Sequence, residues 1–184
     1  MRYVLMLIVF LFAPLGGSLA IAGQDDPRLD PLFARLQKTA DPHEAARIQE
    51  RIWDLWMYSE KEDLNALMKQ GTFALGARDF ELAMESFNAL IELAPNMAEA
   101  WNKRATLFYL MENYDASVAD VKKTLALEPR HFGAIVGMGL IFDALGQHEA
   151  ALEAFRRGLE VNPHMPHIRK KSEQLARELK ERNI

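Results

Sequence analysis

The sequence contains no cysteine and no excess of positive charge. Without cysteine, this chain of 184 residues can form no disulfide, no thiolate metal site, no cysteine nucleophile and no lipid anchor on an amino-terminal cysteine. Lysine and arginine number 22 against 26 aspartates and glutamates, which gives a formal net charge of −4. Nucleic-acid binding starts from a basic surface, so this balance argues against a nucleic-acid partner.

Catalytic and metal-binding motifs are also scarce. Gly133, Gly137 and Gly139 are spaced along one helical pattern and do not form a phosphate-binding loop. His164 and His167 follow the end of a predicted helix and have no evident third ligand, so we predict no metal site. We therefore expect no enzymatic activity and no cofactor, and a binding function is the more natural expectation.

Residues 1–22 differ in composition from the rest of the chain. Arg2 and the free amine precede an unbroken apolar run over residues 3–12, and Ala20-Ile21-Ala22 has the small-x-small pattern that signal peptidases recognise. We predict that residues 1–22 are a signal peptide and that the protein is exported, with the periplasm as the expected location. After cleavage the mature chain is expected not to insert into the membrane. The alternative is an uncleaved membrane anchor, because the stretch is about long enough to span a bilayer.

Internal repeats dominate the remaining sequence. Pro95, Pro129 and Pro163 are each 34 residues apart, and many other positions fall into the same register. Each unit has two stretches of apolar residues at helical spacing, separated by a short polar break, and ends at a proline that cannot continue a helix. Each unit is therefore predicted to be a helical hairpin. The aligned sets include Leu67, Trp101 and Ile135; Gly71, Ala105 and Gly139; Ala83, Ser117 and Ala151; and Phe87, Val121 and Phe155.

These aligned residues resemble the tetratricopeptide-repeat (TPR) family over residues 64–165. The resemblance implies an all-α fold, an α-solenoid of three TPR hairpins at residues 64–97, 98–131 and 132–165. Gln70 and Arg104 stand where the family usually has leucine, and Val121 is small for an aromatic position. These departures predict a middle repeat that is packed somewhat less tightly.

The segments on either side of the repeats are expected to close the solenoid, since a terminal hairpin would otherwise expose an apolar face. Residues 166–184 are predicted to form a capping helix, and residues 30–60 a degenerate helical hairpin, preceded by a flexible tail at 23–29. Asp41 before Pro42 predicts the start of the second helix of that hairpin. Its Trp53 and Trp56 either form a partner-binding patch or belong to a face that packs against the first full repeat.

The resemblance also implies that the first helices of the repeats line a concave groove that receives a peptide or a partner helix. Met68 and Thr72, with Gly133 and Gly137, stand where one TPR subclass grips a peptide carboxyl terminus with Lys, Asn and Arg, so we predict against that clamp. Another possibility is that the amino-terminal hairpin or tail folds back into the groove. The candidate groove residues are Met68, Leu75, Asn102, Thr106, Tyr109, Val136 and Leu140.

A mostly apolar groove of this kind suits an amphipathic helix or an extended apolar segment. The sequence therefore predicts a TPR adaptor or scaffold of the periplasm or cell envelope, whose partner is another protein or peptide segment. Two alternatives stay open: a self-associating structural subunit of an envelope complex and, less in keeping with the motifs, an enzyme accessory domain.

Overall fold

The computed structural model describes residues 23–182, and the expected signal peptide lies outside them. The described chain is all-helical. A short 3-10 helix at Gly23–Asp25 precedes a series of α-helices that accounts for most of the chain. Their bounds are α1 Leu29–Leu36, α2 Pro42–Met57, α3 Glu62–Gly76, α4 Phe80–Leu93, α5 Ala98–Leu110, α6 Tyr114–Leu127, α7 Phe132–Ala144, α8 His148–Val161 and α9 Pro166–Arg182.

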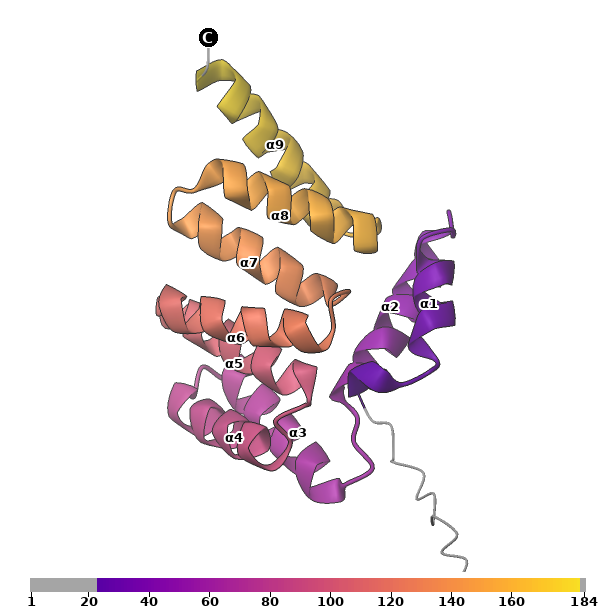
Figure 1. Ribbon diagram of the computed structural model, residues 1–184, viewed down its shortest axis with the longest axis vertical. Coiled ribbons are helices and arrows are strands. Elements are labelled where there is room, and N and C mark those ends of the chain that lie inside the picture. Colours follow the sequence, from indigo (N-terminus) through magenta and orange to yellow (C-terminus); the bar gives the residue numbers. More distant parts are fainter. Residues whose placement is uncertain (1–22, 183–184) are drawn as a thin grey trace, which may run out of the picture.

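Helices α3 to α8 form three antiparallel hairpins that stack one on the next along the long axis of the molecule (Figure 1). Phe87 and Phe155 are fully buried between the two helices of their own hairpins. A β-carbon added at Gly71 would lie 2.5 Å from the Phe87 ring, and one at Gly139 would lie 2.6 Å from the Phe155 ring. The small repeat positions thus let each aromatic ring reach the neighbouring backbone, and the predicted α-solenoid is confirmed.

The tight turn inside each hairpin has one residue in the left-handed backbone conformation. These residues are Arg78 (φ 61°), Glu112 (φ 58°) and Gly146 (φ 71°), again 34 positions apart. In each turn the following N–H donates to a carbonyl five residues earlier, as in Asp79 N to Ala74 O at 2.9 Å, which closes the end of the first helix. Only the third repeat has glycine there, the residue that adopts this conformation without steric cost.

The two unusual polar residues of the repeats have partners sixteen positions later. Arg104 forms two hydrogen bonds with Asp120, at 2.7 and 2.9 Å, and Ser86 Oγ donates to Gln70 Oε1 at 3.2 Å. Because Asp120 and Val121 are both buried, the middle repeat is closed by an ion pair and is not loosened. The expected loose packing is therefore not seen.

Arg104→Leu should destabilise the fold, although leucine is the usual residue there, because Asp120 would keep its buried charge without a partner. We expect a loss of about 2–3 kcal/mol of unfolding free energy, measured by urea denaturation. Arg104→Leu combined with Asp120→Ala should recover most of that loss. Additive effects of the two substitutions would show that the pair is not coupled.

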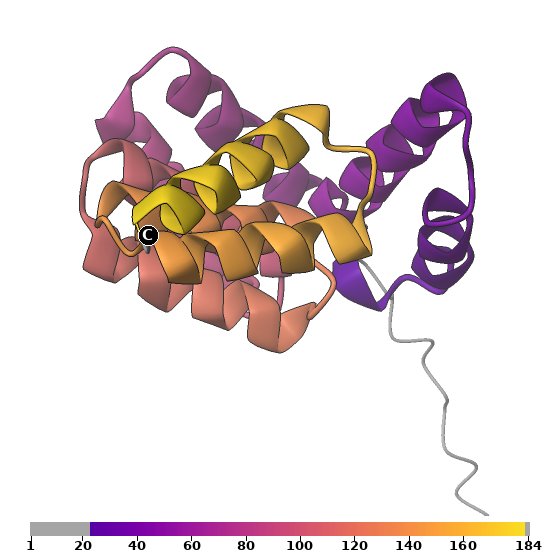
Figure 2. The same cartoon turned by 90° about the horizontal axis from the view of Figure 1, so that it is seen from above.

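The amino-terminal hairpin, α1 and α2, does not extend the stack as a fourth repeat. It lies beside the stack and runs along its long axis, next to the turns that connect successive hairpins (Figures 1 and 2). This hairpin and the 3-10 helix before it bond to the two turns between hairpins and to the turn between α8 and α9. Gln24 bonds to the backbone of Asn96 and Ala98, Asp30 pairs with Arg130 at 2.7 Å, and His164 Nε2 donates to Leu36 O at 3.0 Å.

Two expectations for this region are corrected by the structure. Residues 23–29 are not a flexible tail, because Gln24 is hydrogen-bonded to the first repeat and Leu29 is fully buried. The apolar face of α2 packs chiefly against α1 and the far end of the stack, and not against the first full repeat. The cluster that contains Ile48, Ile52, Leu55 and Trp56 also includes Phe132, Val161 and Met165.

Helix α9, in the segment expected to cap the solenoid, lies against the last hairpin. Leu175 and Leu179 are buried against a cluster that includes Leu152 and Phe155 of α8. Between residues 23 and 182, no helix has both the length and the apolar character that crossing a membrane requires.

Candidate partner-binding groove

Helix α2 lies near the first helix of each hairpin: it contacts α5, packs Trp53 against Phe132 of α7, and borders a cavity with α3. Helix α2 covers the beginnings of α5 and α7, where Trp53 lies under the ammonium group of Lys103, 5.8 Å from its ring centroid. A β-carbon at Gly133 would lie 2.6 Å from the Trp53 ring, so this glycine makes room for the tryptophan. The amino-terminal hairpin thus folds back over one part of the groove, so that this part is occupied by the chain itself.

A buried polar cluster lies beneath this contact. The Trp56 ring stacks on the His131 ring with 4.0 Å between centroids and 11° between planes. His131 Nδ1 accepts a hydrogen bond from Ala134 N, which places the ring proton on Nε2, and Nε2 donates to Glu99 Oε2 at 2.8 Å. Glu99 and His131 are both fully buried, so no solute reaches the pair.

The Glu99 carboxyl is ionised in spite of its burial. Burial alone would raise its pKa, but the hydrogen bonds from His131 and Asn102 and the charge of Lys103 hold the pKa below the usual range. Asn102 Nδ2 donates to Glu99 Oε2 at 2.9 Å, and Lys103 Nζ lies 3.3 Å from Oε1. The carboxylate therefore joins α5, the turn before α7 and, through the stacked ring, α2.

Glu99 should make the stability of the fold pH-dependent. Since its pKa is lower in the folded than in the unfolded chain, its contribution is present above the usual glutamate pKa of about 4.3 and is lost as pH falls through the folded value. We expect Glu99→Gln to cost about 1–3 kcal/mol at pH 7, and the cost to fall steadily as the pH is lowered below about 4.3, measured by urea denaturation. Glu92→Gln, at an exposed glutamate, is the control. A cost of Glu99→Gln that does not change with pH would contradict this assignment.

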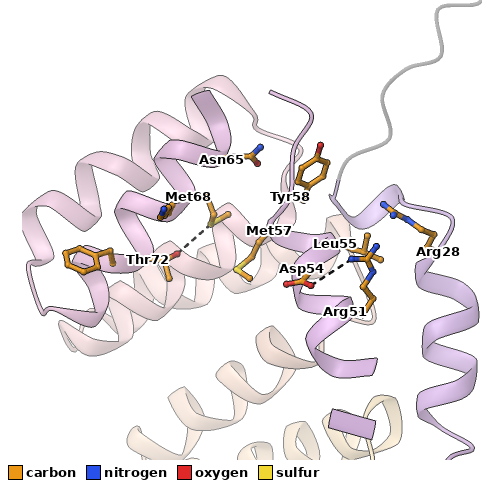
Figure 3. A pocket seen from close by; sticks show the side chains of 11 residues that line it. Arg28, Arg51, Asp54, Leu55, Met57, Tyr58, Asn65, Met68 and Thr72 are labelled. Carbon is orange, nitrogen blue, oxygen red and sulfur yellow. Dashed lines mark hydrogen bonds and ion pairs between the residues drawn. The ribbon is translucent and has the colours of Figure 1, made fainter. Parts of the chain in front are cut away.

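A cavity of about 960 Å³ lies between α2 and α3 (Figure 3). Its walls are mainly apolar, with Leu55 and Met57 on α2 and Met68 on α3. Phe73 lies at the edge of the cavity and is 77% exposed. Its size is in the range of sites that bind drug-sized ligands or the side chains of a peptide. Other residues that line it are Arg28, Arg51, Asp54, Tyr58, Asn65, Lys69 and Thr72.

The structure distributes the candidate groove residues over two cavities. Met68 lines the large cavity, whereas Leu75 lines neither and packs against the core of the first repeat. A second cavity of about 140 Å³ between α5, α6 and α7 brings the other five together, Asn102, Thr106, Tyr109, Val136 and Leu140. Thr106 is exposed, while Asn102 and Val136 are largely buried.

Neither the α2 wall of the large cavity nor the exposure of Phe73 is predicted by the repeat pattern. The repeat register aligns Phe73 with Leu107 and Ile141, which are 0% and 1% exposed, so the alignment predicts a core residue. The place of α2 beside the stack leaves this position open in the first repeat. Among the described residues, no group of three or more His, Asp or Glu side chains is arranged to hold a metal ion.

Comparison with known proteins agrees with this architecture of stacked helical hairpins. A family model described as tetratricopeptide repeat matches residues 68–125 and 102–166, which together span more than half of the chain. A TPR repeat-containing protein of Rhizobium etli is 38% identical over 136 residues, a region that covers 74% of this chain and 67% of the relative. The chain belongs to the tetratricopeptide-repeat family.

Other relatives share only part of their length with this chain. The small glutamine-rich tetratricopeptide repeat-containing protein 2 of Mycosarcoma maydis is 30% identical over 53% of this chain, which corresponds to 28% of that protein. Among solved structures, the first TPR domain of Spaghetti (RPAP3), bound to an HSP90 peptide, has a TM-score of 0.61 at 16% identity and covers 67% of this chain and 98% of that one. MamA has a TM-score of 0.59 at 21% identity, over 81% of this chain and 84% of its own. At these identities the structural likeness shows the fold alone.

Proposed function

We propose that this chain is an adaptor without catalytic activity that holds a segment of another protein, and that the cavity between α2 and α3 is its main binding site. The observation that carries the proposal is this cavity of about 960 Å³, with apolar walls and the exposed Phe73 ring at its edge. Large exposed apolar side chains that border a recess mark sites of protein interaction.

Two further observations support a binding role. A solved TPR domain of similar fold is bound to a peptide of HSP90, so the same arrangement of helices can hold a peptide. The Glu99–His131 pair, a close contact between an acid and a base in the described chain, is fully buried and holds the hairpin in place. It therefore offers no group to a substrate.

A photo-crosslinking amino acid at position 73 should capture a distinct partner in the cells that make the protein. The same group at Glu153, an exposed position on α8, is the matched control. Thr72→Glu should remove the adduct at position 73, because it places a charge in the wall of the large cavity. Tyr109→Ala and Leu140→Glu test the smaller cavity in the same way.

The same adducts from positions 73 and 153, or an adduct that Thr72→Glu leaves unchanged, would exclude the large cavity as the binding site. Loss of the adduct with the Tyr109 and Leu140 variants alone would assign binding to the smaller cavity.

We further propose that the adaptor acts outside the cytoplasm, in the periplasm of a bacterial source. The support is the pattern of residues 1–22, a short basic start, an apolar run and Ala20-Ile21-Ala22. In a bacterial host, mass spectrometry should find a mature chain that begins at Gly23, and Ala20→Glu with Ala22→Glu should block the cleavage. An intact chain in the membrane fraction would favour the alternative of an uncleaved anchor.

Self-association is the second candidate, because Leu110, Met111 and Leu145 are large exposed apolar residues close to the turns within the second and third hairpins. Trp56 offers no such surface, since its side chain is buried inside the chain.

A further inference from the structure

The first hairpin of the stack has an uncovered face that is covered in the other two. Ala66 and Phe73 on α3 are exposed, while the residues 34 positions later, Ala100 and Leu107 on α5, are both 0% exposed. The next pair, Ala134 and Ile141 on α7, is covered in the same way. The same repeat positions are therefore core in two hairpins and surface in the first.

The residues that cover these positions come from the preceding hairpin. Ala100 and Leu107 belong to a cluster with Phe87, Leu90 and Ile91 of α4. Ala134 and Ile141 belong to a cluster with Ala105 and Val121 of the second hairpin. A helix of a preceding hairpin would cover Ala66 and Phe73 in the same manner, but α2 lies beside the stack and leaves that place free (Figure 1).

The charges that line the cavity beside this face are mostly positive, although the chain as a whole is acidic. Glu62 and Asp63, one turn before Ala66 at the start of α3, do not line the cavity. Three cations line the adjoining cavity, Arg28, Arg51 and Lys69, against one acid, Asp54. Arg28 is held by Asp26, whereas Arg51 Nη1 lies 4.0 Å from the nearest Asp54 oxygen. Lys69 has no ion pair with any described residue. Such a local excess of positive charge favours a negatively charged partner.

We infer that the occupant of this site is an acidic amphipathic helix of a partner protein, which lies on α3 as α4 lies on α5. The inference rests on the proposed function and adds the shape and charge of the partner segment. The apolar side of the helix covers Ala66 and Phe73 and inserts a side chain into the cavity between α2 and α3. Its carboxylates face Arg51 and Lys69. An anionic membrane surface has similar chemistry, but a flat bilayer cannot fill a recess between two helices.

Helix α4 supplies a probe with the required properties. Residues 80–93 contain Glu81, Glu85 and Glu92 and no basic residue, and the helix covers the equivalent face of α5 in the folded chain. A fluorescent peptide of this sequence should bind the purified chain in a polarisation assay and gain helical circular dichroism on binding. Control peptides carry Ser86→Pro, which breaks the helix, or lysine in place of the three glutamates.

Two variants of the chain test the site itself, and both change exposed residues, so that the fold is kept. Phe73→Ser should lower the affinity of the chain for the α4 peptide by at least about tenfold. The double variant Arg51→Glu with Lys69→Glu should lower it to a similar extent. The lysine peptide should show the reverse preference and bind best to the charge-inverted variant. Thermal unfolding of each variant checks that the fold is unchanged.

Five outcomes would overturn the inference. The Ser86→Pro peptide could bind as tightly as the α4 peptide, or the charge-inverted variant could bind the α4 peptide with unchanged affinity. The α4 peptide could also fail to bind while crosslinking at position 73 still captures a partner. In that last case the adaptor function would stand without the helix. Binding of phosphatidylglycerol vesicles in place of the peptide would assign the site to a membrane surface. A dimer of the chain that Phe73→Ser dissociates would make a second copy the occupant. Loss of all capture at position 73 would instead remove the proposed function.

Discussion

The stacking of Trp56 on His131, above the buried Glu99 carboxylate, is the contact on which the arrangement of the molecule depends. His131 begins α7 by accepting the Ala134 N–H, orients Glu99 through its other nitrogen, and offers its ring face to α2. One side chain thus joins two repeats to the amino-terminal hairpin. Because α2 is held there, it cannot lie on α3, and both the cavity and the uncovered face of the first hairpin follow from this position.

The repeats could be predicted closely because their determinants are local and occur three times. Proline ends each second helix, and a small residue faces each large ring, as Gly71 faces Phe87. The position of the amino-terminal hairpin could not be predicted in the same way. Its helices were indicated by Asp41-Pro42 and the apolar spacing of α2, but its partners, His131, Phe132 and Met165, are far away in the sequence and appear there as ordinary repeat residues.

The candidate groove residues were predicted from repeat position, and position alone does not tell an open groove from a covered one. Asn102 and Val136 lie where the family pattern puts them, yet neighbouring side chains leave a cavity of only about 140 Å³. Gly133, which the sequence shows only as a glycine within a helix, makes room for Trp53. Arg104 looked like a defect because its partner, Asp120, belongs to the other helix, and the two residues explain each other only as a pair.

The contact between Leu36 and His164 joins residues that are 128 positions apart. The hairpin is synthesised first, but the surface on which it docks is complete only when the third repeat has been made. Each repeat can fold from contacts within itself and with its neighbour, whereas docking of the hairpin must close almost the whole chain into a loop. We therefore expect the hairpin to be the last element to reach its place during folding. Until then its tryptophans, and the part of the repeats that they cover, face the solvent.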